Sequence, residues 1–161
     1  MDFRESLEHK MVERVIERAN DEEIEELFDG LGVADNEEAQ HNMDHYFHYK
    51  LAQASRNVFF MNFIDTYYDL ISEIAKKSHR DQVRREQIAE EHLAIAKAIA
   101  SRDKKAAKQA VRHHMKMVDK KIESDDLQKS GFLRYPKQYP GNKLYEIYSA
   151  IPVFRAVCHS A

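Results

Sequence analysis

Apolar residues recur every three or four positions along most of the chain, with charged residues between them. In the first segment, Leu7, Met11 and Val15 fall on one side of a helix over residues 3–20. The same period predicts further helices over residues 22–30, 36–55, 57–77, 81–101 and 104–123. The pattern therefore predicts an all-α protein, an antiparallel helical bundle of about six helices plus a C-terminal aromatic helix.

The end of the chain differs in composition from the rest. Five of the seven Gly and Pro residues lie after residue 130, which predicts a loop over residues 125–141. Aromatic residues then return at helical spacing over residues 142–157. We therefore expect a helical bundle over residues 1–123, with a loop and helix extension over residues 124–161 packed on the same domain.

Four metal-capable side chains interrupt the apolar stripes of the predicted helices. Asp44 and His48 are one turn apart and close to the apolar side of their segment, so their side chains are neighbours. His92 lies on the apolar stripe of the fifth segment, and His114 lies on that of the sixth. Such groups are costly to bury unless something pairs with them. The pattern therefore indicates a buried metal site, with a hydrogen-bonded polar network as the alternative.

Imidazole and carboxylate ligands suit Zn²⁺, Ni²⁺, Mn²⁺ and Fe²⁺. Four protein ligands can close a tetrahedral zinc site, or leave positions open on an octahedral metal for the carboxylate of a small ligand. Other histidines rank lower as ligands. His41 and His45 lie on the flank of their segment, and His113 lies at the edge of the stripe. The remaining histidines lie near segment ends, where we expect them to be solvated: His9, His79 and His159.

The charge, the hydropathy and the cysteine content limit the binding partners and the cellular location that we expect for the chain. The formal net charge of −3, with acidic and basic residues interspersed, argues against direct nucleic-acid contact by this chain. No stretch approaches the length of a membrane span, and the charged N-terminus is unlike a secretory signal. The single Cys158 excludes an internal disulfide and fits a reducing compartment. We therefore expect a cytoplasmic protein that does not enter a membrane.

The residues around the polar positions form spaced motifs. These are D-x-x-F-H-x-x-L-x-x-A-S-x-N over residues 44–57 and E-H-x-x-I-x-x-A-I-x-x-x-D over residues 91–103, followed by His114. They resemble the signature of the FCD domain, the C-terminal effector-binding domain of FadR-type GntR transcription regulators. The opening R-x-x-L-E, from Arg4 to Glu8, is similar to the first helix of that domain. The resemblance extends over about residues 3–123 and implies a helical bundle.

The resemblance also implies a role for each of these positions. In such domains the Asp and the three His positions hold a metal, here zinc first with nickel, manganese or iron as alternatives, and the metal helps to bind a small carboxylate effector. The family's first-helix Arg and the Asn after the A-S motif lie near this pocket, so Arg4 and Asn57 are predicted effector contacts. The alternatives are a surface Arg4 paired with Glu8 at i+4 and an Asn57 that caps the next helix.

Regulators of this family carry an N-terminal winged helix-turn-helix and commonly act as dimers. The chain starts where the effector domain starts, so we expect no DNA-binding head in it, and a homodimer. The segment after residue 123 is longer and more aromatic than the family leads us to expect. The resemblance thus implies a metal-dependent, carboxylate-binding effector domain of a GntR-type regulator.

Two other functions stay open at this stage. A metal with open coordination also suits a stand-alone hydrolase, lyase or isomerase acting on a small carboxylate substrate. Glu91, beside His92, or Tyr67 is then the candidate acid or base, although Glu91 also suits a role in positioning a ligand. The third hypothesis is a structural module in which the metal only stabilises the fold.

Overall fold

The computed structural model describes residues 3–124, apart from the side chains of residues 70–75, 77–78 and 121–124. This part contains no strand, and its helices are α1 (Phe3–Arg18), α2 (Asp21–Asp29), α3 (Glu37–Ala54), α4 (Val58–Ser78), α5 (Gln82–Ala100) and α6 (Lys104–Ser124). The prediction of an all-α bundle is confirmed. The loop and aromatic helix predicted for the extension lie outside the described residues.

Polar side chains fix where the helices begin. Asn20 accepts a hydrogen bond from the Glu23 amide at 2.8 Å, and the Glu23 carboxylate accepts one from the Asn20 amide at 2.9 Å. This reciprocal pair satisfies two of the free amide groups around the start of α2. The side chains of Asn36, Asp81 and Asp103 cap α3, α5 and α6 by accepting hydrogen bonds from backbone amides of the first turn, without a reciprocal bond. The short connections after α3 and after α5 let the two long helices on either side of each connection pack together.

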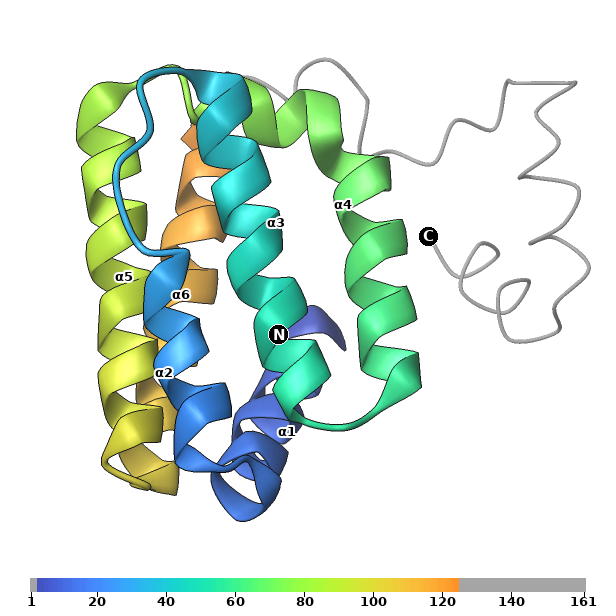
Figure 1. Cartoon of the computed structure of the whole chain (residues 1–161). Coiled ribbons are helices and arrows are strands. Elements are labelled where there is room, and N and C mark those ends of the chain that lie inside the picture. The colour runs from blue at the N-terminus through green and yellow to red at the C-terminus, as the bar shows by residue number, and fades with distance from the viewer. Residues whose placement is uncertain (1–2, 125–161) are drawn as a thin grey trace, which may run out of the picture. The chain divides into compact units, whose positions relative to one another are not determined.

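The helices pack in pairs, α3 against α4 and α5 against α6, and α1 also packs on α6 (Figure 1). One apolar cluster draws on α1, α2, α3, α5 and α6, and includes Val15, Phe47 and Ile95. A second cluster joins α1, α3 and α4, and includes Met11 and Ile64. Because α1 and α3 contribute to both clusters, the polar side chains on their inner faces are enclosed by apolar packing.

The turn between α5 and α6 is fastened to the end of α1. Arg102 has a φ of 56°, in the left-handed region that a non-glycine residue rarely adopts. Its Nη1 donates hydrogen bonds to the carbonyls of Ile16 and Ala19, at 2.9 Å each. These carbonyls lack helical partners at the end of α1, so the guanidinium caps that end. The contact offsets the backbone strain and holds α1 against the α5–α6 pair.

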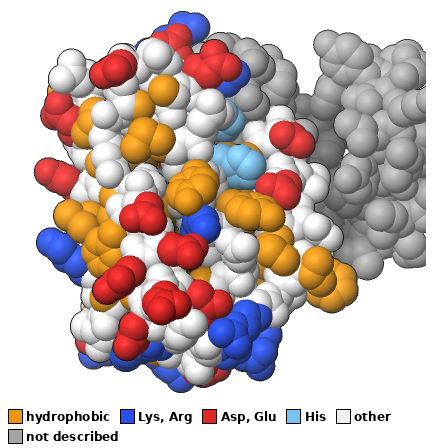
Figure 2. Space-filling view, in the orientation of Figure 1, with side chains coloured by type: hydrophobic (Ala, Val, Ile, Leu, Met, Phe, Trp, Pro, Cys, Tyr) orange, Lys and Arg blue, Asp and Glu red, His pale blue; other side chains and the backbone are white. Residues whose placement is uncertain are grey.

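The surface of the bundle mixes both signs of charge. On the face drawn in Figure 2, acidic and basic side chains are interspersed with apolar ones. Across α1–α6 in the described part of the chain, no helix is both long and apolar enough to cross a membrane.

Truncation of the core should cost far more stability than truncation at the surface. Leu51 is fully buried beside Phe47 in the first cluster. We expect Leu51→Ala to lower the free energy of unfolding by about 2–5 kcal/mol, because it removes apolar contacts and leaves a cavity. The exposed Val83→Ala should stay within about 0.5 kcal/mol of the wild type. Urea denaturation followed by circular dichroism measures both, and equal losses would contradict the assignment of the core.

Candidate metal centre

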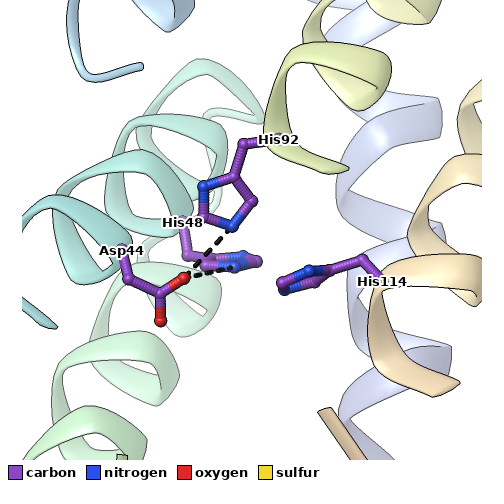
Figure 3. Close-up of side chains that lie close together, drawn as sticks. All are labelled: Asp44, His48, His92 and His114. Atoms are coloured by element: carbon purple, nitrogen blue, oxygen red, sulfur yellow. Dashed lines mark ion pairs between the residues drawn. The ribbon is translucent and has the colours of Figure 1, made fainter. Parts of the chain in front are cut away.

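The structure brings Asp44, His48, His92 and His114 together in the interior of the bundle. Figure 3 shows Asp44 and His48 projecting from α3, with His92 entering from α5 and His114 from α6. One potential ligand atom from each side chain lies within 4.8 Å of the others. All four side chains belong to buried residues, and His48 and His114 are at most 1% exposed. Helices separated in the sequence thus surround one small polar space.

The distances within this cluster are close to those around a single ion. His92 Nε2 lies 3.1 Å and His48 Nε2 3.9 Å from the same oxygen, Asp44 Oδ1 (Figure 3). The ring centres of His92 and His114 are 4.8 Å apart. Ligand atoms bound to one zinc ion at about 2.1 Å lie about 3.4 Å from one another. Small rotations of these side chains therefore bring the four atoms to bonding distance.

Besides Nδ1 of His48, which faces Glu8, two imidazole nitrogens of the cluster are buried without a hydrogen-bond partner. These are Nε2 of His92, whose approach to Asp44 is out of line for a hydrogen bond, and Nε2 of His114. An unsatisfied buried polar atom costs about 1–3 kcal/mol. A fully satisfied polar network, the alternative considered from the sequence, leaves no such atoms. A divalent metal bound at these nitrogens satisfies both, so the donor set fits an ion.

Glu8 of α1 lies behind His48. His48 Nδ1 is 3.0 Å from Glu8 Oε2, within ion-pair distance although out of line for a hydrogen bond. Glu8 Oε1 accepts a hydrogen bond from Arg4 Nε at 2.7 Å. A carboxylate on Nδ1 orients the ring and leaves Nε2 directed to the cluster. The sequence indicates Glu8 only as a partner of Arg4, although its position one residue after Leu7 on the α1 stripe is a signal of burial.

An equivalent arrangement supports His114 from α5. His114 Nδ1 and Glu91 Oε2 share a hydrogen bond of 2.7 Å. Both oxygens of Glu91 accept from Arg84, at 2.6 and 3.1 Å. The sequence did not identify Arg84 as a functional residue. The one available signal was its spacing of two helical turns before Glu91, which places both side chains on one face of the helix. Glu91 thus contacts a ring of the cluster from outside and orients it.

Arg4 is buried, with 7% of its surface exposed, and does not have the surface position considered from the sequence. Its Nη1 donates to the Tyr67 hydroxyl and its Nη2 to the Tyr68 hydroxyl, each at 3.2 Å. Nη2 also lies 3.3 Å from His48 Nε2. The Tyr68 hydroxyl in turn donates to Asp44 Oδ2 at 2.8 Å. The guanidinium is therefore in direct contact with the cluster.

Asn57 lies at the start of α4 and acts there as a helix cap. Its Oδ1 accepts a hydrogen bond from the Phe59 amide at 3.0 Å, and its carbonyl accepts one from the Phe60 amide. The structure therefore contains the capping contact that is the alternative for Asn57 in the sequence. The prediction that Asn57 contacts an effector stays a prediction.

The expectation that His79 is solvated is wrong. His79 is 3% exposed, and its ring centre lies 6.1 Å from that of His41, which is also buried. Its position near a helix end suggested solvent, but Arg85 of α5 donates to its carbonyl at 2.8 Å and helps to cover this end of α4. His9 is also partly covered, with Nε2 3.1 Å from the Lys108 carbonyl.

Two further histidines, which rank low as ligands from the sequence, are accessible to solvent. His113 is exposed, next to the buried His114. His45 retains 35% side-chain exposure and lies 2.9 Å from Asp65. His159 lies outside the described residues.

Burial sets the protonation states of the cluster. It lowers the pKa of His92 to about 3 and lowers the pKa of His114 from its usual value. Burial alone would raise the pKa of Asp44, but its contacts with His92 and His48 hold that pKa well below its usual range. At neutral pH the cluster therefore presents neutral His92 and His114 rings and an ionised carboxylate. These are the forms in which such side chains bind metals.

A family model described as the FCD domain matches residues 1–117. No curated protein and no solved structure matches the chain.

The carboxylate behind His114 should strengthen metal binding. We expect Glu91→Gln to lower zinc affinity by about 10–100-fold, because the ring loses the negative partner that orients it and raises its basicity. Glu90→Gln, at the exposed neighbouring position, is the matched control and should bind zinc as the wild type does. Competition against a chromogenic chelator measures both. Equal affinities of the two variants would contradict the role assigned to Glu91.

Acid should destabilise the metal-free protein through His92. Its pKa is about 3 in the folded state and about 6.5 when unfolded, so the unfolded chain binds the extra proton. Stability from this group is complete above about pH 6.5 and is lost as the pH falls towards 3. His92→Gln should therefore flatten the dependence of the free energy of unfolding on pH between about 6.5 and 4.5.

The control for this measurement is His113→Gln, because His113 is exposed. It should keep the slope of the metal-free wild type in chelator-containing buffer. A slope that is the same in both variants and the wild type would show that His92 is not buried in its neutral form.

Proposed function

Because the chain belongs to the FCD domain family, we propose that it is a metal-dependent effector-binding domain of a GntR-type transcription regulator. A divalent metal binds to Asp44, His48, His92 and His114, and a small carboxylate binds at that metal. Zinc is the first choice, with nickel, manganese and iron as alternatives, since all accept imidazole and carboxylate ligands. The observation that carries the proposal is the convergence of these four side chains in a buried space that holds unsatisfied nitrogens.

The charges around the cluster support an anionic effector. Three ionised carboxylates, Asp44, Glu8 and Glu91, face two guanidinium groups, Arg4 and Arg84, which leaves a net charge of −1 among these groups. A divalent ion reverses the sign of that sum. The ion supplies a positive charge and open coordination positions for a carboxylate when it is bound. Effector binding is therefore expected to require the metal.

The contacts of α1 with the cluster support a mechanism by which effector binding at the site affects the rest of a regulator. Arg4 and Glu8 both belong to α1, and both contact His48. A ligand that changes these contacts changes the preferred position of α1 relative to α3. FCD-type regulators are commonly dimeric, and we propose a homodimer in which such a shift biases the geometry of the two subunits.

The enzyme hypothesis receives less support from the same contacts. Its candidate acid or base Glu91 is held by Arg84 and by His114. Its other candidate, the Tyr67 hydroxyl, accepts a hydrogen bond from Arg4. Both groups therefore position neighbouring charged side chains, and effector binding is the function that the site supports best.

Removal of one of the four proposed ligands should lower the metal content of the protein. The wild type and the exposed control His113→Ala should each bind about one zinc ion per chain, as four ligands imply. His114→Ala should retain much less, because it removes a ligand from α6. Mass spectrometry of the protein after dialysis measures the metal. Unchanged zinc content in His114→Ala would overturn the proposed site.

The same samples test the effector. Acetate, hexanoate, succinate and citrate are added to zinc-loaded and chelator-treated protein, and thermal unfolding is recorded. At least one acid should raise the Tm of the loaded wild type and of His113→Ala, but not of metal-free protein, because binding to the native state stabilises it. Zinc that raises the Tm with no response to any acid would favour the structural module instead. Chemical conversion of an added acid would favour the enzyme.

A further inference from the structure

A pocket of about 340 Å³ lies among the first turn of α1, the middle of α4 and the second half of α6. Its apolar lining consists of Phe3, Phe63, Tyr67, Met115 and Val118. Small-molecule sites in proteins have volumes of about 300–1,000 Å³ and mostly apolar walls with few polar groups. The size and lining of this pocket therefore fit the apolar body of a small ligand.

Arg4 joins this pocket to the candidate metal centre. It lines the pocket together with Tyr67, while its Nη2 lies 3.3 Å from His48 Nε2. Met115, also in the lining, directly follows His114 in the chain. The inner wall of the pocket is therefore made by a buried cation and by residues adjacent to the cluster.

The guanidinium of Arg4 retains capacity for an anion. It has five N–H groups, and the hydrogen bonds to Glu8, Tyr67, Tyr68 and His48 account for four of them. A metal on His48 takes the Nε2 lone pair that Arg4 now contacts, which frees a second N–H group. Two donors of one guanidinium match the two oxygens of a carboxylate.

The remaining charges in the lining disfavour a second carboxylate. Besides Arg4, the charged residues of the lining are Glu5 and Asp119, and both are acidic. Glu5 is partly offset by Arg112, at 3.3 Å. Among the lining residues in the described part of the chain, Arg4 is the one cation, so a second carboxylate finds no counter-charge in the lining. An acid with one head group and an uncharged body is therefore better matched than a dicarboxylate.

We infer that the effector is a monocarboxylate with an apolar chain or ring, its head group bound by Arg4 at the metal centre and its body in the pocket between α1, α4 and α6. This inference rests on the proposed effector-binding function and names the ligand class. The apolar body provides selectivity, because each buried methylene contributes about 0.8 kcal/mol, which corresponds to about a fourfold gain in affinity.

Titration calorimetry of the zinc-loaded full chain tests the ligand class. The probes are acetate, butanoate, hexanoate and phenylacetate, with succinate and citrate for comparison. Affinity should rise about fourfold with each methylene from acetate to hexanoate, and the dicarboxylate and tricarboxylate should bind more weakly than hexanoate. An affinity that does not depend on chain length, or tighter binding of succinate or citrate, would overturn the inference.

A charge placed in the pocket tests its position. Val118→Glu should weaken hexanoate binding at least tenfold and acetate binding by a smaller factor, because the added charge lies where the apolar body of hexanoate packs. Val83→Glu, at an exposed apolar site of α5 outside the pocket lining, should bind both acids as the wild type does. Circular dichroism confirms that both variants fold. Hexanoate affinity that is unaffected by Val118→Glu would place the ligand elsewhere and overturn the inference.

The outcomes separate this inference from the proposed function. If zinc does not bind but hexanoate still does, with sensitivity to Val118→Glu, the metal-dependent function fails and the pocket assignment stands. If zinc binds and acids bind without dependence on chain length or on Val118, the function stands and the inference fails. Zinc binding with no binding of any acid overturns the inference together with the effector part of the proposed function.

Discussion

The compensation of buried charge inside the bundle is the constraint on which the rest of the structure depends. Asp44, Glu8 and Glu91 are ionisable groups enclosed among apolar helices, and each would cost several kcal/mol if left unpaired. Arg4 and Arg84, also buried, each bind one of the glutamates. Each glutamate shares a helix with its arginine and also contacts a histidine of another helix, and Asp44 contacts His92 of α5. These contacts tie α1, α3, α5 and α6 to one mutual arrangement by electrostatics as well as by packing.

The histidine nitrogens of the cluster are not all compensated in this way. Those on the outside have charged partners, and some of those on the inside have none. On the outside of the cluster, His114 has a close carboxylate at Nδ1 that is itself bound by an arginine. On the inside, Nε2 of His92 and of His114 lack hydrogen bonds. The protein therefore supports the rings from behind and leaves their inward nitrogens for a ligand that the described side chains do not supply. In the proposed function, a divalent cation fills this place, and its positive charge attracts an acid.

Sequence periodicity placed each cluster member correctly on the inward face of its helix, because each placement depends on a local rule. Asp44 and His48 share a face at i and i+4 whatever their surroundings, and His92 and His114 interrupt otherwise apolar stripes. The same reasoning misplaced His79, since proximity to a helix end says nothing about which other helix covers that end. It also left Arg4 undecided between surface and site, because the i+4 pair with Glu8 looks the same in either environment.

The sequence by itself thus determined the six helices of the bundle, their inward faces and the polar residues on those faces, since helix period, caps and apolar spacing act over a few residues. Only the tertiary structure decided which of these residues meet. The chain from Arg84 through Glu91 to His114 and the contact of Arg4 with His48 join different helices. Such contacts depend on the rotation and offset with which whole helices pack, and the summed burial of many side chains sets these quantities.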